Sequence, residues 1–207
     1  MKILAYDTET TGIPRGHDYT QPDMPHLAAV TGILYDTDEA YVISSVNLFV
    51  QPDNWSMLPE AAAVNGLTTE FLTEYGIPLP HVLRPFMYLA DKADLCVAHN
   101  APFDQKIMSI GLWRWINDYE ESRNEEDAHY IVQQWQNIPQ FCTQRESKAA
   151  VGALDKRGRI KMPKLTEAYQ HFFGKELDKA HSANADTVAV LEIFMALQDE
   201  TMTDVGD

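Results

Sequence analysis

Five ionisable residues stand in three short segments far apart in the sequence, and their types suit metal-assisted phosphoryl transfer. Asp7 and Glu9 lie near the amino terminus, Asp104 lies mid-chain, and His181 precedes Asp186 near the carboxyl terminus. Carboxylates are hard oxygen ligands that suit cations such as Mg²⁺, whereas structural zinc favours Cys and His. If the fold brings the segments together, they predict a site for divalent cations with an imidazole beside it.

Each segment alone also has an ordinary structural explanation. Asp7 and Glu9 are two residues apart on an expected strand, so both side chains leave one face and would repel each other unless a cation lay between them. The simpler alternative is a polar strand end that faces water. Asp104 and Asp186 fall in the first turns of expected helices, where acidic residues complement the helix dipole. His181 is a candidate general base only through its spacing to Asp186 and the other two segments.

Hydrophobic patterning predicts the elements that must position these residues. Strands are expected over residues 2–6, 28–35, 41–50, 94–99 and 141–143, the first three as an antiparallel meander. Helices are expected over residues 59–64, 68–75, 80–90, 164–173 and about 183–198, with one more that starts at Asp104. The buried face of the last helix is predicted to consist of Val188, Leu191, Phe194, Met195 and Leu197. This order of elements predicts an α/β domain with one mixed sheet flanked by helices.

The 207 residues suffice for one domain with a sizeable core. We expect a single domain over residues 1–200 and a short acidic tail over 201–207. Residues 114–139 are polar, and we interpret them as a partly helical insertion that Trp113, Trp115 and Trp135 pack onto the domain. The chain ends soon after the last expected helix, which favours a free-standing enzyme or one that docks a protein partner through 114–139.

Charge and cysteine content narrow the class of protein. The formal net charge of −15 argues against a general positive field that grips long duplexes, so a nucleic acid substrate would be held as a short strand. Simple solubility is the alternative explanation of the acidity. The two cysteines, Cys96 and Cys142, form no CxxC pair and are expected to be buried reduced thiols. With no signal peptide or membrane-spanning stretch in the sequence, we expect a cytoplasmic protein.

A family resemblance rests on these three segments in this order. Asp-Thr-Glu-Thr-Thr-Gly from Asp7, His-Asn-Ala-Pro-Phe-Asp from His99 and His-Ser-Ala-Asn-Ala-Asp from His181 resemble the three motifs of the DEDD (DnaQ-like) 3′–5′ exonucleases, histidine subtype. That group includes the proofreading subunit of bacterial replicative DNA polymerase, ribonuclease T and oligoribonuclease. The resemblance covers nearly the whole chain. Residues 114–139 have no clear counterpart, and Cys142–Thr143 stands where an Asp-Thr pair is common.

The resemblance implies a ribonuclease H-like fold and a two-metal mechanism. Asp7 would bridge two Mg²⁺ ions, for which Mn²⁺ can substitute, and Glu9, Asp104 and Asp186 would complete the metal site. His181 would take the proton of the attacking water. The products would be nucleoside 5′-monophosphates, released one at a time from 3′ ends.

Substrate contacts are expected from three sources. Thr8, Thr10 and Thr11 surround the first motif, and Asn65 lies in the segment 59–68, which is similar to the family's loop before its second motif. Arg157 and Arg159 belong to the one basic island of the chain and could track phosphates, although a solvated surface loop explains that island equally well. Single-stranded DNA is the favoured substrate. The alternatives are an exoribonuclease of the ribonuclease T or oligoribonuclease kind, and a non-catalytic interaction module on the same fold.

Overall fold

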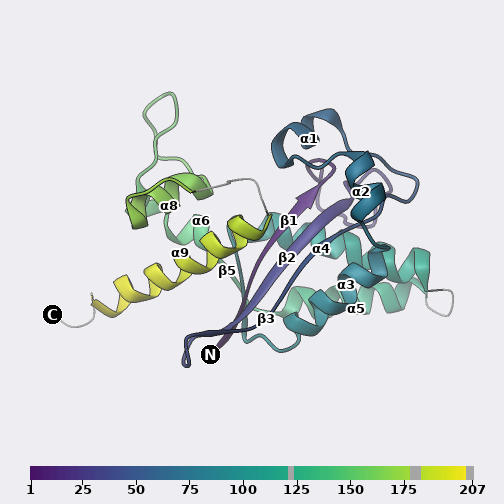
Figure 1. The fold of residues 1–207 in the computed structure, drawn as a ribbon, viewed down its shortest axis with the longest axis horizontal. Helices are drawn as coiled ribbons and strands as arrows, with labels where there is room; N and C mark the ends of the chain where they lie inside the picture. Colours follow the sequence, from purple (N-terminus) through teal and green to yellow (C-terminus); the bar gives the residue numbers. More distant parts are fainter. Residues whose placement is uncertain (121–123, 178–182, 204–207) are drawn as a thin grey trace.

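The computed structural model describes residues 1–120, 124–177 and 183–203, and within them a five-stranded mixed sheet carries helices on both faces (Figure 1). The strands are β1 (Lys2–Thr10), β2 (Leu27–Asp36), β3 (Tyr41–Phe49), β4 (Leu95–Ala98) and β5 (Gln140–Cys142). Their order across the sheet is β3-β2-β1-β4-β5. Strands β1 to β3 form the predicted antiparallel meander, whereas β4 and β5 run parallel to β1. The predicted ribonuclease H-like α/β architecture is confirmed.

The helices fall between these strands and after them. They are α1 (Pro59–Asn65), α2 (Thr69–Tyr75), α3 (Leu79–Ala90), α4 (Ala101–Arg114), the π-helix η1 (Trp115–Tyr119), α5 (Glu125–Asn137), α6 (Thr143–Glu146), α7 (Lys148–Val151), α8 (Leu165–Phe173) and α9 (Ala183–Thr203). None of the helices in the described ranges has the length and apolar character needed to cross a bilayer.

The two faces of β1 belong to two separate cores, because successive side chains of a strand point in opposite directions. Leu4 and Tyr6 face the larger core, which α3, α4 and α5 cover. Ile3 and Ala5 face a smaller core under α9. The residues that continue the second set along the strand are Asp7 and Glu9, so the pattern that buries Ile3 and Ala5 also aims these acids toward α9.

The described part of residues 114–139, which leaves out 121–123, is packed into the domain. It comprises the end of α4, η1, and α5, and α5 lies along α4. Trp135 is completely buried, and its ring meets the ring of Tyr6 edge-on at 5.5 Å between centroids. Trp113 is also buried, and Trp115 packs partly exposed against the same core. The expectation that these tryptophans pack the segment onto the domain is therefore confirmed.

Several strands and helices begin or end at other residues than predicted, in part because polar residues extend them beyond their apolar part. Strand β1 runs to Thr10 because Asp7 and Glu9 pair with Thr31 and Ala29 of β2. Helix α4 begins at Ala101 rather than Asp104, and α9 extends to Thr203, into the predicted tail. Residues 204–207 of that tail lie outside the described residues.

One predicted core position of the last helix is wrong. Val188 is 40% exposed, whereas Val190 and Ile193 are fully buried. A helix turns about 100° per residue, so Val188 lies nearly opposite Val190. The other predicted positions, Leu191, Phe194, Met195 and Leu197, do pack against the cores.

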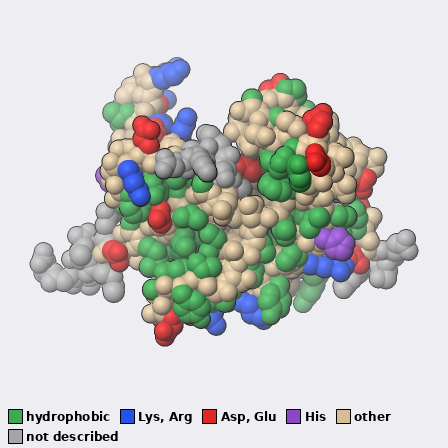
Figure 2. Space-filling model, viewed as in Figure 1, with side chains coloured by type: hydrophobic (Ala, Val, Ile, Leu, Met, Phe, Trp, Pro, Cys, Tyr) green, Lys and Arg blue, Asp and Glu red, His purple; other side chains and the backbone are tan. Residues whose placement is uncertain are grey.

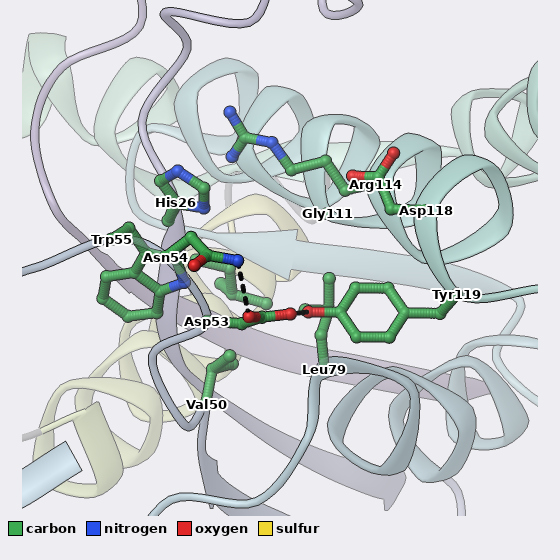
Figure 3. A pocket seen from close by; sticks show the side chains of 11 residues that line it. His26, Val50, Asp53, Asn54, Trp55, Leu79, Gly111, Arg114, Asp118 and Tyr119 are labelled. Carbon is green, nitrogen blue, oxygen red and sulfur yellow. Dashed lines mark hydrogen bonds between the residues drawn. The ribbon is translucent and has the colours of Figure 1, made fainter. Parts of the chain in front are cut away.

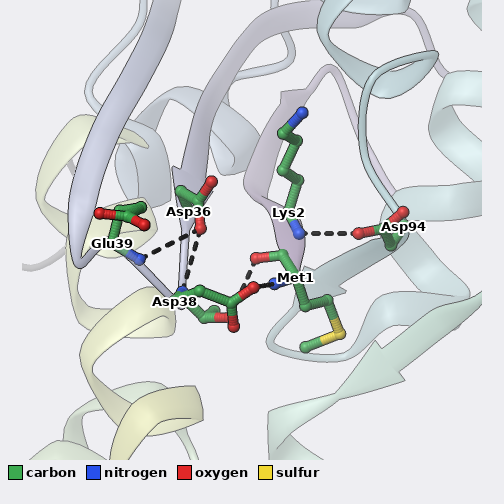
Figure 4. Close-up of polar contacts among 7 residues, drawn as sticks. Met1, Lys2, Asp36, Asp38, Glu39 and Asp94 are labelled. Atoms are coloured by element: carbon green, nitrogen blue, oxygen red, sulfur yellow. Dashed lines mark hydrogen bonds and ion pairs between the residues drawn. The ribbon is translucent and has the colours of Figure 1, made fainter.

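The end of the sheet away from the acids is closed by polar contacts (Figure 4). The backbone N–H of Lys2 donates to Asp94 at 2.8 Å, and the terminal ammonium of Met1 pairs with Asp38 at 2.5 Å. Asp36 accepts the backbone N–H groups of the turn between β2 and β3. These contacts fix the start of β1 and hence the register that places its carboxyl end. Cys96 and Cys142 are buried free thiols, as predicted.

Candidate active site

Three of the predicted carboxylates meet at the carboxyl end of β1. Asp7 and Glu9 leave the α9 face of the strand, and Asp186 reaches them from the first turn of α9. One carboxylate oxygen of each residue lies within 4.8 Å of the corresponding oxygens of the other two. Asp186 is buried, and Asp7 and Glu9 are half-buried. Segments almost 180 residues apart in the sequence thus form one acidic cluster.

Asp104 is not one of these three residues, but it approaches them from the other face of the sheet and its charge acts on Asp7 and Glu9. A tight connection aims it there. Only His99 and Asn100 separate β4 from α4, and Asn100 adopts a left-handed backbone with φ of 79° and ψ of 46°. Asparagine tolerates that conformation better than most residues. One oxygen of the buried Asp104 carboxylate then accepts both the backbone N–H of Thr8 at 3.1 Å and its hydroxyl at 2.7 Å. These bonds hold Asp104 close to β1.

The electrostatics of the cluster favour a bound cation. Burial, followed by the charges of Asp104, Glu9 and Asp186, raises the pKa of Asp7 well above its ordinary value. Burial and the charges of Asp186 and Asp104 raise the pKa of Glu9 to about 8, although a hydrogen bond from Asn65 opposes the shift. Burial also raises the pKa of Asp104 to about 7, against the effect of its bonds from Thr8. At neutral pH, carboxylates that are this hard to ionise together either keep protons or share the site with a positive partner.

The donor set fits a hard divalent cation. Every ligand atom in the cluster is a carboxylate oxygen, and oxygen donors suit Mg²⁺ and Mn²⁺ better than they suit structural zinc. Within the described residues, no Cys or His belongs to the group of metal-competent side chains. The coarse prediction of a metal site is supported by this geometry.

The three predicted threonines are buried, and their hydroxyls are used within the protein. Thr8 donates to Asp104, Thr10 donates to the carbonyl of Gly12 at 2.5 Å, and Thr11 accepts the backbone N–H of His26 at 2.9 Å. The threonines therefore shape the end of β1 and the loop after it. His26 holds this loop, and sequence reasoning missed it because no motif marks it.

Asn65 lies beside the cluster, at the end of α1. Its amide nitrogen donates to the carbonyl of Thr10 at 3.3 Å, and its amide oxygen accepts the N–H of Leu67 at 3.0 Å. Asn65 also lowers the pKa of Glu9, so its side chain lies next to the acidic cluster. The structure thus brings Asn65 to the site that the sequence predicts for it.

The basic island forms a hairpin that projects from the domain, with Lys and Arg side chains at its outer end (Figure 2). Its two arms meet at an isolated bridge between Leu154 and Ile160. Asp155 accepts the backbone N–H groups of Arg157 and Arg159 at 2.8 and 3.0 Å and pairs with the Arg159 guanidinium at 2.8 Å. Arg159 therefore helps to hold the hairpin, whereas no ion pair of Arg157 occurs among the described residues.

His99 ties the base of this hairpin to the sheet. Its Nε2 lies 3.0 Å from the carbonyl oxygen of Pro163, and its Nδ1 lies 3.0 Å from the hydroxyl of Thr143. A carbonyl can only accept, so Nε2 carries a proton and, in the neutral ring, Nδ1 accepts from Thr143. Burial lowers the pKa of His99 to about 4, which keeps the ring neutral at pH 7. His181, the fifth predicted residue, lies outside the described residues.

Comparison with known families decides the class of protein. The family model described as Exonuclease, RNase_T, matches residues 4–194. The chain belongs to this exonuclease family. The matched range includes Asp7, Glu9, Asp104, His181 and Asp186, and the predicted family resemblance is confirmed. No curated protein sequence matches the chain.

Several solved structures with the same fold are exonuclease I proteins. E. coli exonuclease I in complex with a dA16 oligonucleotide is 19% identical, with a TM-score of 0.69 over 97% of this chain and 41% of that one. The zinc-bound form of the E. coli exonuclease I–ssDNA complex is 18% identical (TM-score 0.67, 97% and 40% covered). Exonuclease I from Methylocaldum szegediense is 19% identical (TM-score 0.66, 96% and 40% covered). The chain spans about two fifths of the length of these proteins.

Proposed function

We propose that the chain is a metal-dependent 3′–5′ exonuclease that shortens single-stranded DNA and releases nucleoside 5′-monophosphates. The convergence of Asp7, Glu9 and Asp186 within 4.8 Å, in a member of an exonuclease family, carries this proposal. The choice of single-stranded DNA is supported by the solved structures of the same fold that hold single-stranded oligonucleotides.

The four carboxylates would hold two Mg²⁺ ions, or Mn²⁺ in their place. When bound, such cations offset the negative charge that develops on a phosphate and make water more acidic. Asp7 and Glu9 are held in position by β1, and Asp186 by α9. Thr8 fixes one oxygen of Asp104 with two hydrogen bonds, and the Asp104 carboxylate would complete the metal site from α4. His181, placed by sequence alone, would accept the proton of the attacking water.

The remaining predicted residues would guide the strand to the acids. Thr10, Thr11 and Asn65 hold the loop after β1 next to Glu9, where a terminal nucleotide would lie. Arg157 would contact backbone phosphates from the projecting hairpin, and Arg159 would contribute mainly by holding the hairpin through Asp155. This assignment concentrates positive charge locally, as a chain with a net charge of −15 requires.

The test is degradation of matched DNA and RNA 20-mers, labelled at the 5′ end, with Mg²⁺, Mn²⁺ or EDTA. We expect a ladder that shortens from the 3′ end of DNA, 5′-monophosphate products, and no reaction in EDTA. Asp7→Asn should lower the rate by at least about a hundredfold, whereas Asp91→Asn, a change of an exposed carboxylate at the carboxyl end of α3, should not alter it. Faster cleavage of RNA would reassign the substrate, and absence of cleavage on both would favour a non-catalytic module.

A further inference from the structure

A cavity of about 410 Å³ lies on the face of the sheet opposite Asp7 and Glu9 (Figure 3). Its floor is apolar, because Leu27, Val50 and Leu79 belong to the core that α3 and α4 cover. Gly111 of α4 also lines it and adds no side chain. A cavity of this volume with an apolar floor and a few polar groups has the usual character of a small-molecule site.

One wall of the cavity is an aromatic pair. The rings of His26 and Trp55 stack at 5.1 Å between centroids, with 14° between their planes. Burial and the nearby charge of Arg114 lower the pKa of His26 to about 4, so the pair is uncharged at pH 7. Neutral, nearly parallel rings offer a flat surface on which another planar ring can stack.

Polar groups with fixed positions complete the cavity. The Arg114 guanidinium donates to the carbonyls of Pro25 at 2.8 Å and Met24 at 2.6 Å, which holds it at one side. At the opposite edge, the Tyr119 hydroxyl extends from η1 and donates to Asp53 at 2.9 Å (Figure 3). The cavity therefore presents a guanidinium donor and a carboxylate acceptor on separate sides.

The charge balance of the cavity limits its ligand. Asp53 and Asp118 contribute two negative charges against the single positive charge of Arg114. This excess opposes phosphate and favours an uncharged molecule that has donors as well as acceptors. A planar ring with polar edges of both kinds matches the stacked wall, the guanidinium and the carboxylates together.

We propose that this cavity binds an unpaired nucleobase, stacked on the His26–Trp55 pair with its polar edges toward Arg114 and Asp53. The choice of a nucleobase rests on the proposed nuclease function. A second hollow, lined by Thr11 and Gly12, shares His26 with the cavity and so adjoins the loop that follows Glu9. The base could thus belong to a bound strand or to a free nucleoside.

Calorimetric titration of the full chain with guanosine, adenosine, cytidine and thymidine in EDTA tests this inference without any hydrolysis. We expect Trp55→Ala to weaken nucleoside binding about tenfold or more, and Trp55→Phe to stay within about threefold of wild type, because aromatic rings support base stacking. Asp118→Trp leaves Trp55 in place but fills the mouth of the cavity, and should abolish binding. Glu39→Gln, an exposed change in the turn between β2 and β3, should leave binding unchanged.

A second experiment separates the two sources of the base. A set of single-stranded DNA oligonucleotides, each carrying 5-iodouracil at a different position, is bound to the protein in EDTA and irradiated. The crosslinked peptides are then identified by mass spectrometry. Crosslinks to Trp55 or Tyr119 identify a strand, whereas nucleoside binding without them identifies free nucleosides. No nucleoside binding by the wild type, or equal binding by Asp118→Trp, would overturn the inference. Nucleoside binding by a chain that cleaves neither DNA nor RNA would overturn the proposed function alone.

Discussion

Neutralising Glu9 should stabilise the protein in the absence of metal while it destroys activity. The pKa of Glu9 is raised from 4.5 to about 8, so its ionised form is disfavoured in the folded chain. A carboxyl group whose pKa is higher in the folded than in the unfolded protein lowers stability as pH rises above the unfolded value. At pH 7 the gap of roughly 2.5 pKa units corresponds to a cost of about 3 kcal/mol. Because neighbouring acids share this repulsion, we expect Glu9→Gln in EDTA to gain about 1 to 3 kcal/mol.

The assay is thermal and urea unfolding at pH 7 in EDTA, with and without excess Mg²⁺. For a chain of this length the gain corresponds to a melting temperature about 3 to 8 °C higher. Glu39→Gln, a change of the same charge in an exposed turn, controls for the general relief of net charge and should shift the melting temperature by less than about 1 °C. Saturating Mg²⁺ should stabilise the wild type by about 3 kcal/mol at a hundredfold excess over its dissociation constant, and Glu9→Gln by less.

The opposite order of stabilities would refute this reasoning. If Glu9→Gln melts below the wild type in EDTA, the Glu9 carboxylate makes net favourable contacts in the metal-free chain. The acidic cluster would then be a satisfied polar network rather than a site that lacks a cation. If the wild type gains nothing from Mg²⁺, the cluster does not bind that ion, whatever the activity of the chain on DNA.

Three further predictions concern the elements around the site. Because the pKa of His99 is about 4 when folded and about 6.5 when unfolded, its contribution to stability is complete above pH 6.5 and is lost as pH falls toward 4. The stability deficit of His99→Gln, measured by urea unfolding, should therefore narrow by about 1 to 2 kcal/mol from pH 7 to pH 5. Trp135→Ala should cost about 3 to 5 kcal/mol in the same assay, and the exposed Tyr130→Ala less than about 0.5. Arg157→Glu should weaken binding of single-stranded DNA and reduce the slope of log affinity against log salt by about one, and an unchanged slope would remove the hairpin from the substrate path.

Most of the fold follows from patterns that the sequence displays openly. The apolar run Ile3-Leu4-Ala5-Tyr6 and the two β-prone segments after it, joined by a polar turn, predict the meander, because buried central strands need apolar residues on both faces. The extension of β1 to Thr10 could not be predicted in this way. Its last residues are polar, and they stay in the strand because β2 supplies pairing partners such as Thr31. Val188 was wrongly predicted to be in the core for a different reason. It is apolar but lies on the outer side of its helix, and the residue type alone does not indicate which way a side chain points.

The site was predictable as a set of residues but not as a set of contacts. Asp7, Glu9 and Asp186 could be grouped by motif, and the structure places them together. The bonds from Thr8 to Asp104 and from His99 to Pro163 join positions 96 and 64 residues apart, and nothing in the local sequence indicates either pairing. The same holds for the stacked His26 and Trp55, which become neighbours only after β2 and β3 have paired.

The helices that supply Asp104 and Asp186 cannot by themselves balance the acidic cluster. Both acids lie in first turns, where the helix dipole favours negative charge by about 0.3 to 1 kcal/mol. The pKa of Asp104 is nevertheless raised from 3.8 to about 7, a shift that corresponds to roughly 4 kcal/mol. Burial therefore outweighs the dipole several-fold, even with two hydrogen bonds from Thr8 in its favour. Because Asp104 and Asp186 are buried beside the half-buried Asp7 and Glu9, protons or a bound cation must supply the larger part of the compensation. We therefore expect metal binding and stability to be coupled at the acidic cluster.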